Sequence, residues 1–325
     1  MRLPRRRFLK LAAAAAALPA VSRLAHGQAY PTRPIRIMVG YPAGGSTDLV
    51  ARIVGQWVSE RLGQPIVIEN KPGAGTNLAA QTVVAAPADG YTLLFAASTY
   101  AINATLYDTL PYNFQRDIVP VAGLAELPLV MDINRSLPVN TLVEFIAYAK
   151  ANPGKINFAS FGVGTIAHLA IELFRLTTGV EIVHVPYRGG AAMITDMLAG
   201  RIQAGIDAMP NSLPHIRSGA VRALAVLPAM RTAALPDVPT FGETLPGFEV
   251  STWSGIGAPR GTAGGIITIL NRVINAALED PDVKTRLADV GGTPLLYTPA
   301  EFGAVIRADT EKWAKVIRSA GIKPE

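Results

Sequence analysis

The sequence predicts an α/β protein built from two lobes with a cleft between them. Short apolar runs alternate with helical patterns along the chain, which is typical of strands that pair mostly in parallel with helices between them. About 297 residues remain after an N-terminal export signal, enough for two domains. Two extended apolar segments, residues 119–124 and 248–253, interrupt the alternation and would join the lobes as a hinge.

Residues 1–29 are expected to be an export signal that does not belong to the fold. The basic segment Pro4–Lys10 precedes a short alanine-rich apolar run, Leu11–Ala20, which is too short to span a bilayer. Small residues follow, and we expect cleavage between about Gly27 and Tyr30. The pair Arg5-Arg6 also fits the twin-arginine export pattern, so that route and the ordinary secretory route both stay open. The mature protein is therefore expected in the periplasm.

The charge and residue usage of the mature chain exclude several classes of function. Six of the 30 basic residues, and no acidic residue, lie in residues 1–28, which leaves 24 basic against 24 acidic residues. Because no basic tract remains, nucleic acid is not expected as a partner. The chain has no cysteine, and His168, His184 and His215 do not form a zinc-binding helix motif. We expect neither a metal nor a cofactor.

The apolar runs predict eight strands, each of four to six residues. In chain order they are Ile35–Val39, Ile66–Glu69, Thr92–Ala96, Leu129–Ile133, Asn157–Ser160, Val180–Val185, Ala204–Ala208 and Ala223–Val226.

Helices are predicted between these strands. The helix from Thr47 should bury Leu49, Ile53, Trp57 and Val58 and end at Gly63. Two others follow the loops at residues 160–165 and 186–190, spanning about 166–177 and 191–198. Capping boxes open the helices after Thr141 and Thr298, with Glu144 and Glu301 as the third helical residues.

The two extended segments set the predicted domain boundaries. If both segments cross between lobes, the N-terminal and C-terminal parts of the chain form one lobe. Lobe 1 then comprises residues 30–125 and 247–325, and lobe 2 comprises residues 126–246.

A glycine-rich turn after the first strand is a candidate anion site. The turn Gly40–Thr47 opens a helix, whose first N–H groups and macrodipole favour a negative charge. Its outer spacing matches a Walker A loop, but Ser46 stands where the phosphate-neutralising lysine belongs. An uncharged turn lined by amides suits a carboxylate better. The candidate residues are Tyr41, Ala43, Gly44, Gly45, Thr47 and Asp48.

A second turn, residues 160–165, repeats this pattern before the helix that carries His168. Ser160, Gly164 and Thr165 offer hydroxyls and backbone N–H groups at a helix start. The alternative interpretation makes Ser160 the nucleophile of an exported serine hydrolase acting on a small ester or amide. Ser160 does not lie in a G-x-S-x-G motif, and this alternative requires a histidine within hydrogen-bond reach of its Oγ.

Other polar residues also follow predicted strands, where ligands bind in open α/β sheets. They are Ser98 and Thr99, the sequence Tyr187-Arg188, and Asp207. Arg188 could clamp a carboxylate or be a solvated loop residue, and the sequence leaves these two roles open.

Five stretches after the signal resemble the Bug receptors, the periplasmic solute-binding components of tripartite tricarboxylate transporters. They are YPTRPIRIMVGYPAGGSTDLVAR, IENKPGAGTNLAAQTVVAAPADGYTLL, FASFGVGTIAHLAIELF, VHVPYRGGAAMITDMLAGRIQAGID and LPDVPTFGETLPGFEV. The resemblance covers essentially all of the mature chain. It implies a two-lobe periplasmic-binding-protein fold of type II, with two crossing strands and the ligand cleft between the lobes.

The resemblance also implies the ligand and the partners. A small organic mono- or dicarboxylate would lie between Gly44-Gly45 and Gly164-Thr165, and the protein would perform no catalysis. Phe161 departs from the small or polar residue common there, so it would narrow the pocket or contact the ligand. Two integral-membrane transporter subunits are the implied partners, a sensor kinase stays open, and we expect a monomer.

Overall fold

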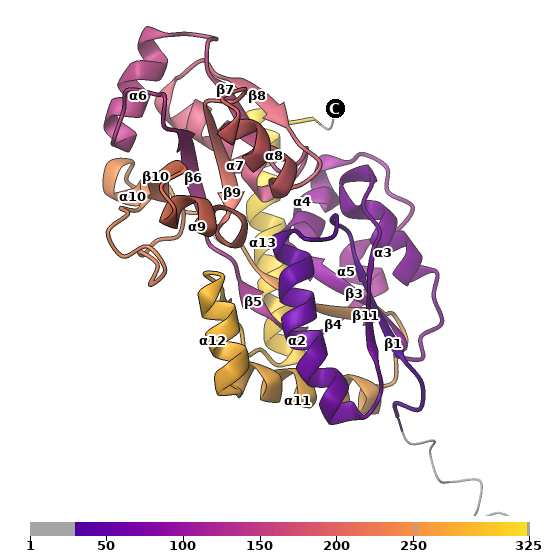
Figure 1. Cartoon of the computed structure of the whole chain (residues 1–325). Coiled ribbons are helices and arrows are strands. Elements are labelled where there is room, and N and C mark those ends of the chain that lie inside the picture. Colours follow the sequence, from indigo (N-terminus) through magenta and orange to yellow (C-terminus); the bar gives the residue numbers. More distant parts are fainter. Residues whose placement is uncertain (1–29, 251, 324–325) are drawn as a thin grey trace, which may run out of the picture.

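Two five-stranded sheets, each flanked by helices, organise the chain into two lobes (Figure 1). The computed structural model describes residues 30–250 and 252–323. The predicted export signal lies outside the described residues.

The first sheet has the strand order β2-β1-β3-β11-β4. Its strands are β1 (Ile35–Val39), β2 (Ile66–Asn70), β3 (Thr92–Ala97), β4 (Ile118–Gly123) and β11 (Ser254–Pro259). The last of these enters from a segment more than a hundred residues after β4, so the sheet joins N-terminal and C-terminal parts of the chain.

The second sheet has the order β10-β6-β9-β7-β8. It contains β6 (Leu129–Asn134), β7 (Asn157–Ser160), β8 (Val183–Pro186), β9 (Ala204–Ala208) and β10 (Val221–Val226). The predicted strand Val180–Val185 therefore begins too early, because residues 180–182 precede the ladder.

Both sheets are mixed, which corrects the prediction of mostly parallel pairing. β1 pairs in parallel with β2 and β3, and β7 pairs in parallel with β8 and β9. β11 and β6 are antiparallel to both of their neighbours. Each is the strand by which the chain enters a lobe from the other lobe. It therefore runs away from the cleft, while the other strands end toward the cleft.

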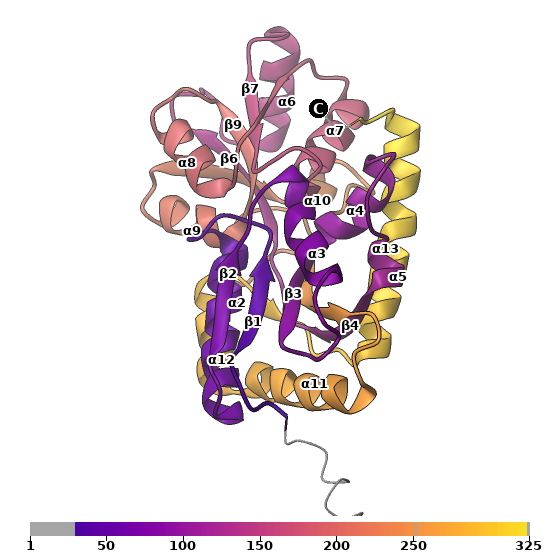
Figure 2. The same cartoon turned by 90° about the vertical axis from the view of Figure 1, so that its right-hand side faces the viewer.

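Helices cover the faces of both sheets (Figures 1 and 2). They are α2 (Ser46–Leu62), α3 (Asn77–Val84), α4 (Ser98–Leu106), α5 (Phe114–Asp117), α6 (Leu142–Ala151), α7 (Ile166–Thr178), α8 (Gly190–Leu198), α9 (Met209–Arg217), α10 (Phe241–Thr244), α11 (Gly264–Glu279), α12 (Pro281–Asp289) and α13 (Pro299–Ala320), with a short 3₁₀ turn, η1 (Ala74–Thr76).

The helix predictions hold with two corrections. α2 buries Ile53 and Val58 and ends at Gly63, but Leu49 is 36% exposed and does not belong to the buried face. The capping box is complete at α13, whereas at α6 only half of it forms. There Thr141 accepts from the Glu144 N–H, and the Glu144 carboxylate accepts from the N–H of Asn140 instead of Thr141.

The lobes are joined by two extended segments that lie side by side. The first was predicted at residues 119–124, but most of that segment is β4, and the connection follows it at 124–128. The Leu127 N–H donates to the Thr252 hydroxyl, and that hydroxyl donates to the Leu127 carbonyl. A two-stranded pairing of β5 (Ala125–Glu126) with β12 (Thr293–Pro294) supports the same region.

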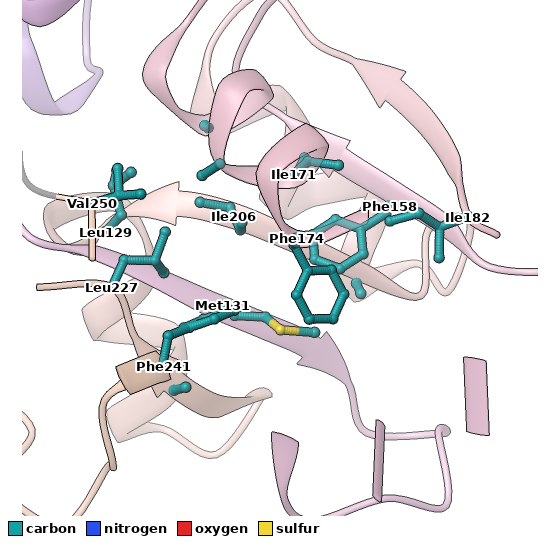
Figure 3. Close-up of a cluster of buried hydrophobic side chains, with 14 of the residues drawn as sticks. Leu129, Met131, Phe158, Ile171, Phe174, Ile182, Ile206, Leu227, Phe241 and Val250 are labelled. Carbon is teal, nitrogen blue, oxygen red and sulfur yellow. The ribbon is translucent and has the colours of Figure 1, made fainter. Parts of the chain in front are cut away.

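The long helix α13 connects the cores of the two lobes (Figure 2). Its first half contributes Phe302 and Ile306 to a cluster with β3 and α4, and its second half inserts Trp313 and Ile317 into the core of lobe 2. That core packs aromatic and aliphatic side chains of β6, β7, β9 and α7 (Figure 3). We keep the predicted domain boundaries as a proposal. They assign α13 to lobe 1, although α13 packs on both lobes.

Candidate functional site

The cleft between the lobes is lined by the loops that follow the carboxyl ends of β1, β3, β8 and β9. Its enclosed volume is about 80 Å³, so it suits a small molecule. Lobe 1 contributes Tyr41–Ala43, Gly45–Thr47 and Ala97–Thr99; lobe 2 contributes Leu129, Phe161, Ile166, Arg188–Ala191, Ala208 and Asn211; the connecting region contributes Leu127 and Thr252–Ser254.

Two helices aim free backbone donors into this cleft from opposite lobes. α2 begins after Gly45 and α8 begins after Gly189, and no side chain caps either helix. No carbonyl or side chain among the described residues accepts from the N–H groups of Ser46, Thr47, Gly190 or Ala191. Because the start of a helix carries partial positive charge, the two N-termini together favour an anion between them.

Two further helices also begin at the cleft without a side-chain cap, but their first N–H groups have partners. The Ser98 N–H of α4 donates to the Trp253 carbonyl, and the Met209 N–H of α9 donates to the Pro128 carbonyl. In α4 and α9 the N–H group of the first residue is therefore already used, whereas in α2 and α8 it has no acceptor among the described residues.

Arg188 is the only charged side chain that lines the cleft among the described residues. It is exposed, and its guanidinium makes no hydrogen bond or ion pair with a described residue. A guanidinium can bind a carboxylate through two parallel hydrogen bonds. Within the described part of the chain, the cleft walls thus carry one free cation and no acid.

The first glycine-rich turn is held in shape by one of its predicted ligand residues. The Gly44 N–H and the Arg52 Nε both donate to Asp48 Oδ2, at 3.0 and 2.9 Å. Burial of Asp48 acts to raise its pKa, but the hydrogen bonds from Arg52, Gly44 and Asn70 outweigh it and lower the pKa. Asp48 and Gly44 therefore fix the turn and do not line the cleft, whereas Tyr41, Ala43, Gly45 and Thr47 line it.

Tyr41 closes one side of the cleft. Its hydroxyl lies 2.6 Å from Thr99 Oγ1 at the start of α4, and burial raises its pKa to about 12. Its ring meets Phe161 of the other lobe edge to face, with centroids 6.5 Å apart. Ser98 also lines the cleft, but its hydroxyl is within reach of the Trp253 carbonyl. The structure thus brings Ser98, Thr99 and Phe161 to the predicted site.

The second predicted turn lies elsewhere. Thr165 caps its own helix α7 by accepting from the His168 N–H, and its hydroxyl donates to the Gly162 carbonyl at 2.7 Å. Gly164 packs against α4, where an added Cβ would lie 2.5 Å from Leu106 Cδ2. Neither residue lines the cleft, so the structure does not place a carboxylate clamp between Gly44-Gly45 and Gly164-Thr165.

Ser160 does have a histidine partner. Its Oγ lies 2.8 Å from His184 Nε2, so the distance criterion for the hydrolase is met. Ser160 is fully buried, however, and does not line the cleft. Burial and the neighbouring His168, whose ring stacks on His184 with centroids 4.2 Å apart, lower the pKa of His184 to about 3. A histidine with that pKa is a poor general base near neutral pH, and a buried hydroxyl cannot reach a substrate.

Asp207 lies beneath the cleft, not on its wall. Its Oδ1 accepts from the Ala208 N–H and from Asn211 Nδ2, at 2.7 and 3.0 Å. Its Oδ2 is buried without a partner among the described residues. Burial raises the pKa of Asp207 to about 7, against weaker opposing effects of its two hydrogen bonds.

Tyr187 is likewise turned away from the cleft. Its hydroxyl donates to Asp196 Oδ2 at 2.8 Å, and burial together with that carboxylate raises its pKa to about 12. It lines a second groove behind Tyr41 and Phe161.

Cleft-lining residues that were not predicted from the sequence include Ser46, the pair Gly189-Gly190, Ala191, Asn211 and Trp253. The glycine pair could have been found, because it lies where α8 begins, as Gly44-Gly45 lies where α2 begins. Asn211 lies in the first turn of α9 and Trp253 in a connecting segment, and no local sequence pattern distinguishes either one.

The described residues contain no group of three or more histidines and acids that could hold a metal ion. None of the described helices combines the length and hydrophobicity needed to span a bilayer.

Two α/β lobes, two crossing segments and a small cleft between the carboxyl ends of the strands define a bilobal solute-binding protein. A family model described as "Tripartite tricarboxylate transporter family receptor" matches residues 50–322. The chain belongs to this family, whose members are periplasmic solute-binding receptors and not enzymes. The predicted family and fold class are therefore confirmed.

Relatives and solved structures agree with this membership. Protein BugT of Bordetella pertussis is 41% identical over 297 residues, which covers 90% of this chain and 91% of that protein. A protein of R. palustris solved with adipate superposes with a TM-score of 0.88 at 37% identity, covering 91% of this chain and 100% of that one. MatC of Rhodopseudomonas palustris, solved with bound malate, gives 0.84 at 33% identity over 89% and 100%.

Proposed function

We propose that this receptor captures a small organic mono- or dicarboxylate in the cleft between α2 and α8. The observation that carries the proposal is the pair of uncapped helix N-termini that line the same cleft from opposite lobes, where the described residues provide one unpaired arginine and no acid. One carboxylate group would accept from the N–H groups of Ser46 and Thr47 in lobe 1 and of Gly190 and Ala191 in lobe 2. Because the donors come from both lobes, the ligand would hold the lobes closed.

The ligands of the structural neighbours support this chemistry. One neighbour was solved with adipate and another with malate, both dicarboxylates. Tyr41 and Thr99, two of the predicted residues, would contact one side of the ligand. Arg188 would neutralise the negative charge of the ligand carboxylate. Oriented amides in a desolvated cleft would supply most of the affinity, since the mature chain carries no net charge.

We further propose that two integral-membrane subunits receive the ligand from this protein. The family match supports a role as the receptor of such a transporter. The proposal includes export to the periplasm by means of a signal that is then cleaved. It also includes a monomeric state of the receptor and contact of the receptor with a sensor kinase. Copurification of the tagged receptor from membranes that express candidate subunits tests the partnership.

Calorimetric titration with malate and adipate tests the site. Arg188→Met should weaken binding by about tenfold or more, because the ligand loses its charge-assisted bonds. Arg217→Met is the matched control: Arg217 is also an exposed arginine of lobe 2, but it lies at the far end of α9 and should leave affinity within about twofold. Equal affinity of the wild type and Arg188→Met would place the carboxylate elsewhere.

A further inference from the structure

A second groove lies directly behind the cleft, and the proposed function does not use it. Its volume is about 510 Å³, several times that of the cleft. Its walls come from both lobes: residues 72–76 and Tyr107 on one side, and residues 162, 163, 165 and 186–187 on the other. We call it the outer groove.

The cleft and the outer groove share one wall. Tyr41, Pro42, Phe161, Arg188 and Gly189 line both spaces. The aromatic contact between Tyr41 and Phe161 spans the two lobes within this wall. A molecule too long for the cleft would therefore meet these two rings first.

The two rings differ in how firmly they are held. Tyr41 is tied by its hydroxyl to Thr99, and its carbonyl accepts from Asn70 Nδ2. The Phe161 side chain packs on the hydrophobic core of lobe 2 and is partly exposed, and Phe161 precedes Gly162, whose φ is 151°. Rotating Phe161 breaks no hydrogen bond of its side chain, so Phe161 is the movable half of the wall.

The chemistry of the outer groove fits the far end of an extended acid. Among the residues that the structure describes, no carboxylate lines it, Arg188 is its only charged side chain, and its other large side chains are aromatic. The Tyr107 hydroxyl has no partner among the described residues and lies over Gly75, where an added Cβ would be 2.5 Å away. Aromatic faces suit a methylene chain, and the Tyr107 hydroxyl suits a terminal carboxylate.

We propose that Phe161 is a specificity-determining residue that limits the length of the ligand, with the outer groove receiving the distal end of longer dicarboxylates when Phe161 is displaced. This inference rests on the proposed function. The position of Phe161 against Tyr41 makes this chain selective for short acids, because a longer acid must first separate the two rings.

Titration of succinate, adipate, suberate and sebacate into wild type and Phe161→Ala tests the inference. The quantity compared is the ratio of the dissociation constants of sebacate and succinate, in which a general loss of affinity cancels. Phe161→Ala should improve this ratio in favour of sebacate by about tenfold or more, and Phe161→Leu by less. Val163→Ala, which enlarges the outer groove without opening the wall, should leave the ratio within about twofold of wild type.

The possible failures are distinguishable. Binding with the same length preference in wild type and Phe161→Ala overturns the role of Phe161 and leaves the receptor function intact. An equal gain in Val163→Ala also overturns it, because groove volume would then set the limit. If no acid of the series binds the wild type or any variant, the proposed carboxylate function and the proposed length limit are both wrong.

Discussion

At the residue scale, Asp207 shows how a buried acid beneath the cleft links stability to pH. Its pKa is ordinarily about 3.8 and is raised to about 7 in the fold, chiefly by burial. The folded protein therefore holds a proton that the unfolded chain releases. The stabilising contribution is complete below pH 3.8 or so and is lost as pH rises toward about 7.

We predict that this loss depends on the carboxyl group of Asp207. The wild type should lose on the order of a few kcal/mol of unfolding free energy between about pH 4 and pH 7, since each pKa unit corresponds to about 1.4 kcal/mol. Asp207→Asn keeps the shape and cannot ionise, so its loss should be smaller. Urea denaturation at several pH values measures both proteins. If the unfolding free energies of the wild type and Asp207→Asn changed equally with pH, Asp207 would not titrate in this range.

Ser160 and His184 show where reasoning from single residues stops. The sequence suggested both a ligand hydroxyl and a nucleophile, and the distance to His184 agreed with the second role. Burial speaks against both roles, because a serine with no exposure reaches neither a substrate nor a ligand. The local motif indicates which chemistry a side chain can perform, but it does not indicate how deeply that side chain is buried in the fold.

At the element scale, capping separates two helix starts that look alike in sequence. Both α2 and α7 follow a strand and a glycine-containing turn. α7 is capped by Thr165, whereas the cap position of α2 is Gly45, which offers no side chain. A capped helix start has already used a donor that a ligand would need.

We predict that Thr165→Val changes stability but not ligand binding. Losing the cap should cost about 1 kcal/mol of unfolding free energy. Thr165→Ser retains the hydroxyl and is the matched control for the cap. Malate and adipate should bind Thr165→Val within about twofold of wild type. A large loss of affinity would instead restore the turn at residues 160–165 as a ligand contact.

The difference between local sequence patterns and long-range packing explains which elements could be predicted from the sequence. Strand and helix positions follow from local periodicity, so β1, β7 and β9 were predicted with their observed bounds. The antiparallel direction of β6 was not predicted, because it depends on where the chain crosses between lobes, and β11 was not predicted as a strand at all. The partner of α2 across the cleft was also missed, since opposition of α2 and α8 exists only after both sheets form.

At the scale of the whole molecule, α13 packs into the cores of both lobes. Trp313 is 1% exposed and lies in the core of lobe 2, although its helix begins against the sheet of lobe 1. The Ile102 and Leu106 side chains of α4 join the same core. The lobes are therefore coupled by packing as well as by the two crossing segments.

We predict that Trp313→Ala weakens this coupling. Removing the indole should cost about 3–5 kcal/mol of unfolding free energy and broaden or split a single thermal transition into two. Lys315→Ala, at an exposed position of the same helix, should change stability by less than about 0.5 kcal/mol. A single sharp transition with little loss in Trp313→Ala would show that the lobes do not depend on this contact.

We propose above that one ligand carboxylate lies between the starts of α2 and α8. A crystal structure of the receptor with malate or adipate would show where the carboxylate binds. We expect a carboxylate within hydrogen-bond distance of the N–H groups of Ser46 or Thr47 and of Gly190 or Ala191, with the Arg188 guanidinium beside it. A carboxylate bound instead by Gly164 and Thr165, with the start of α8 empty, would show that the proposed site is wrong.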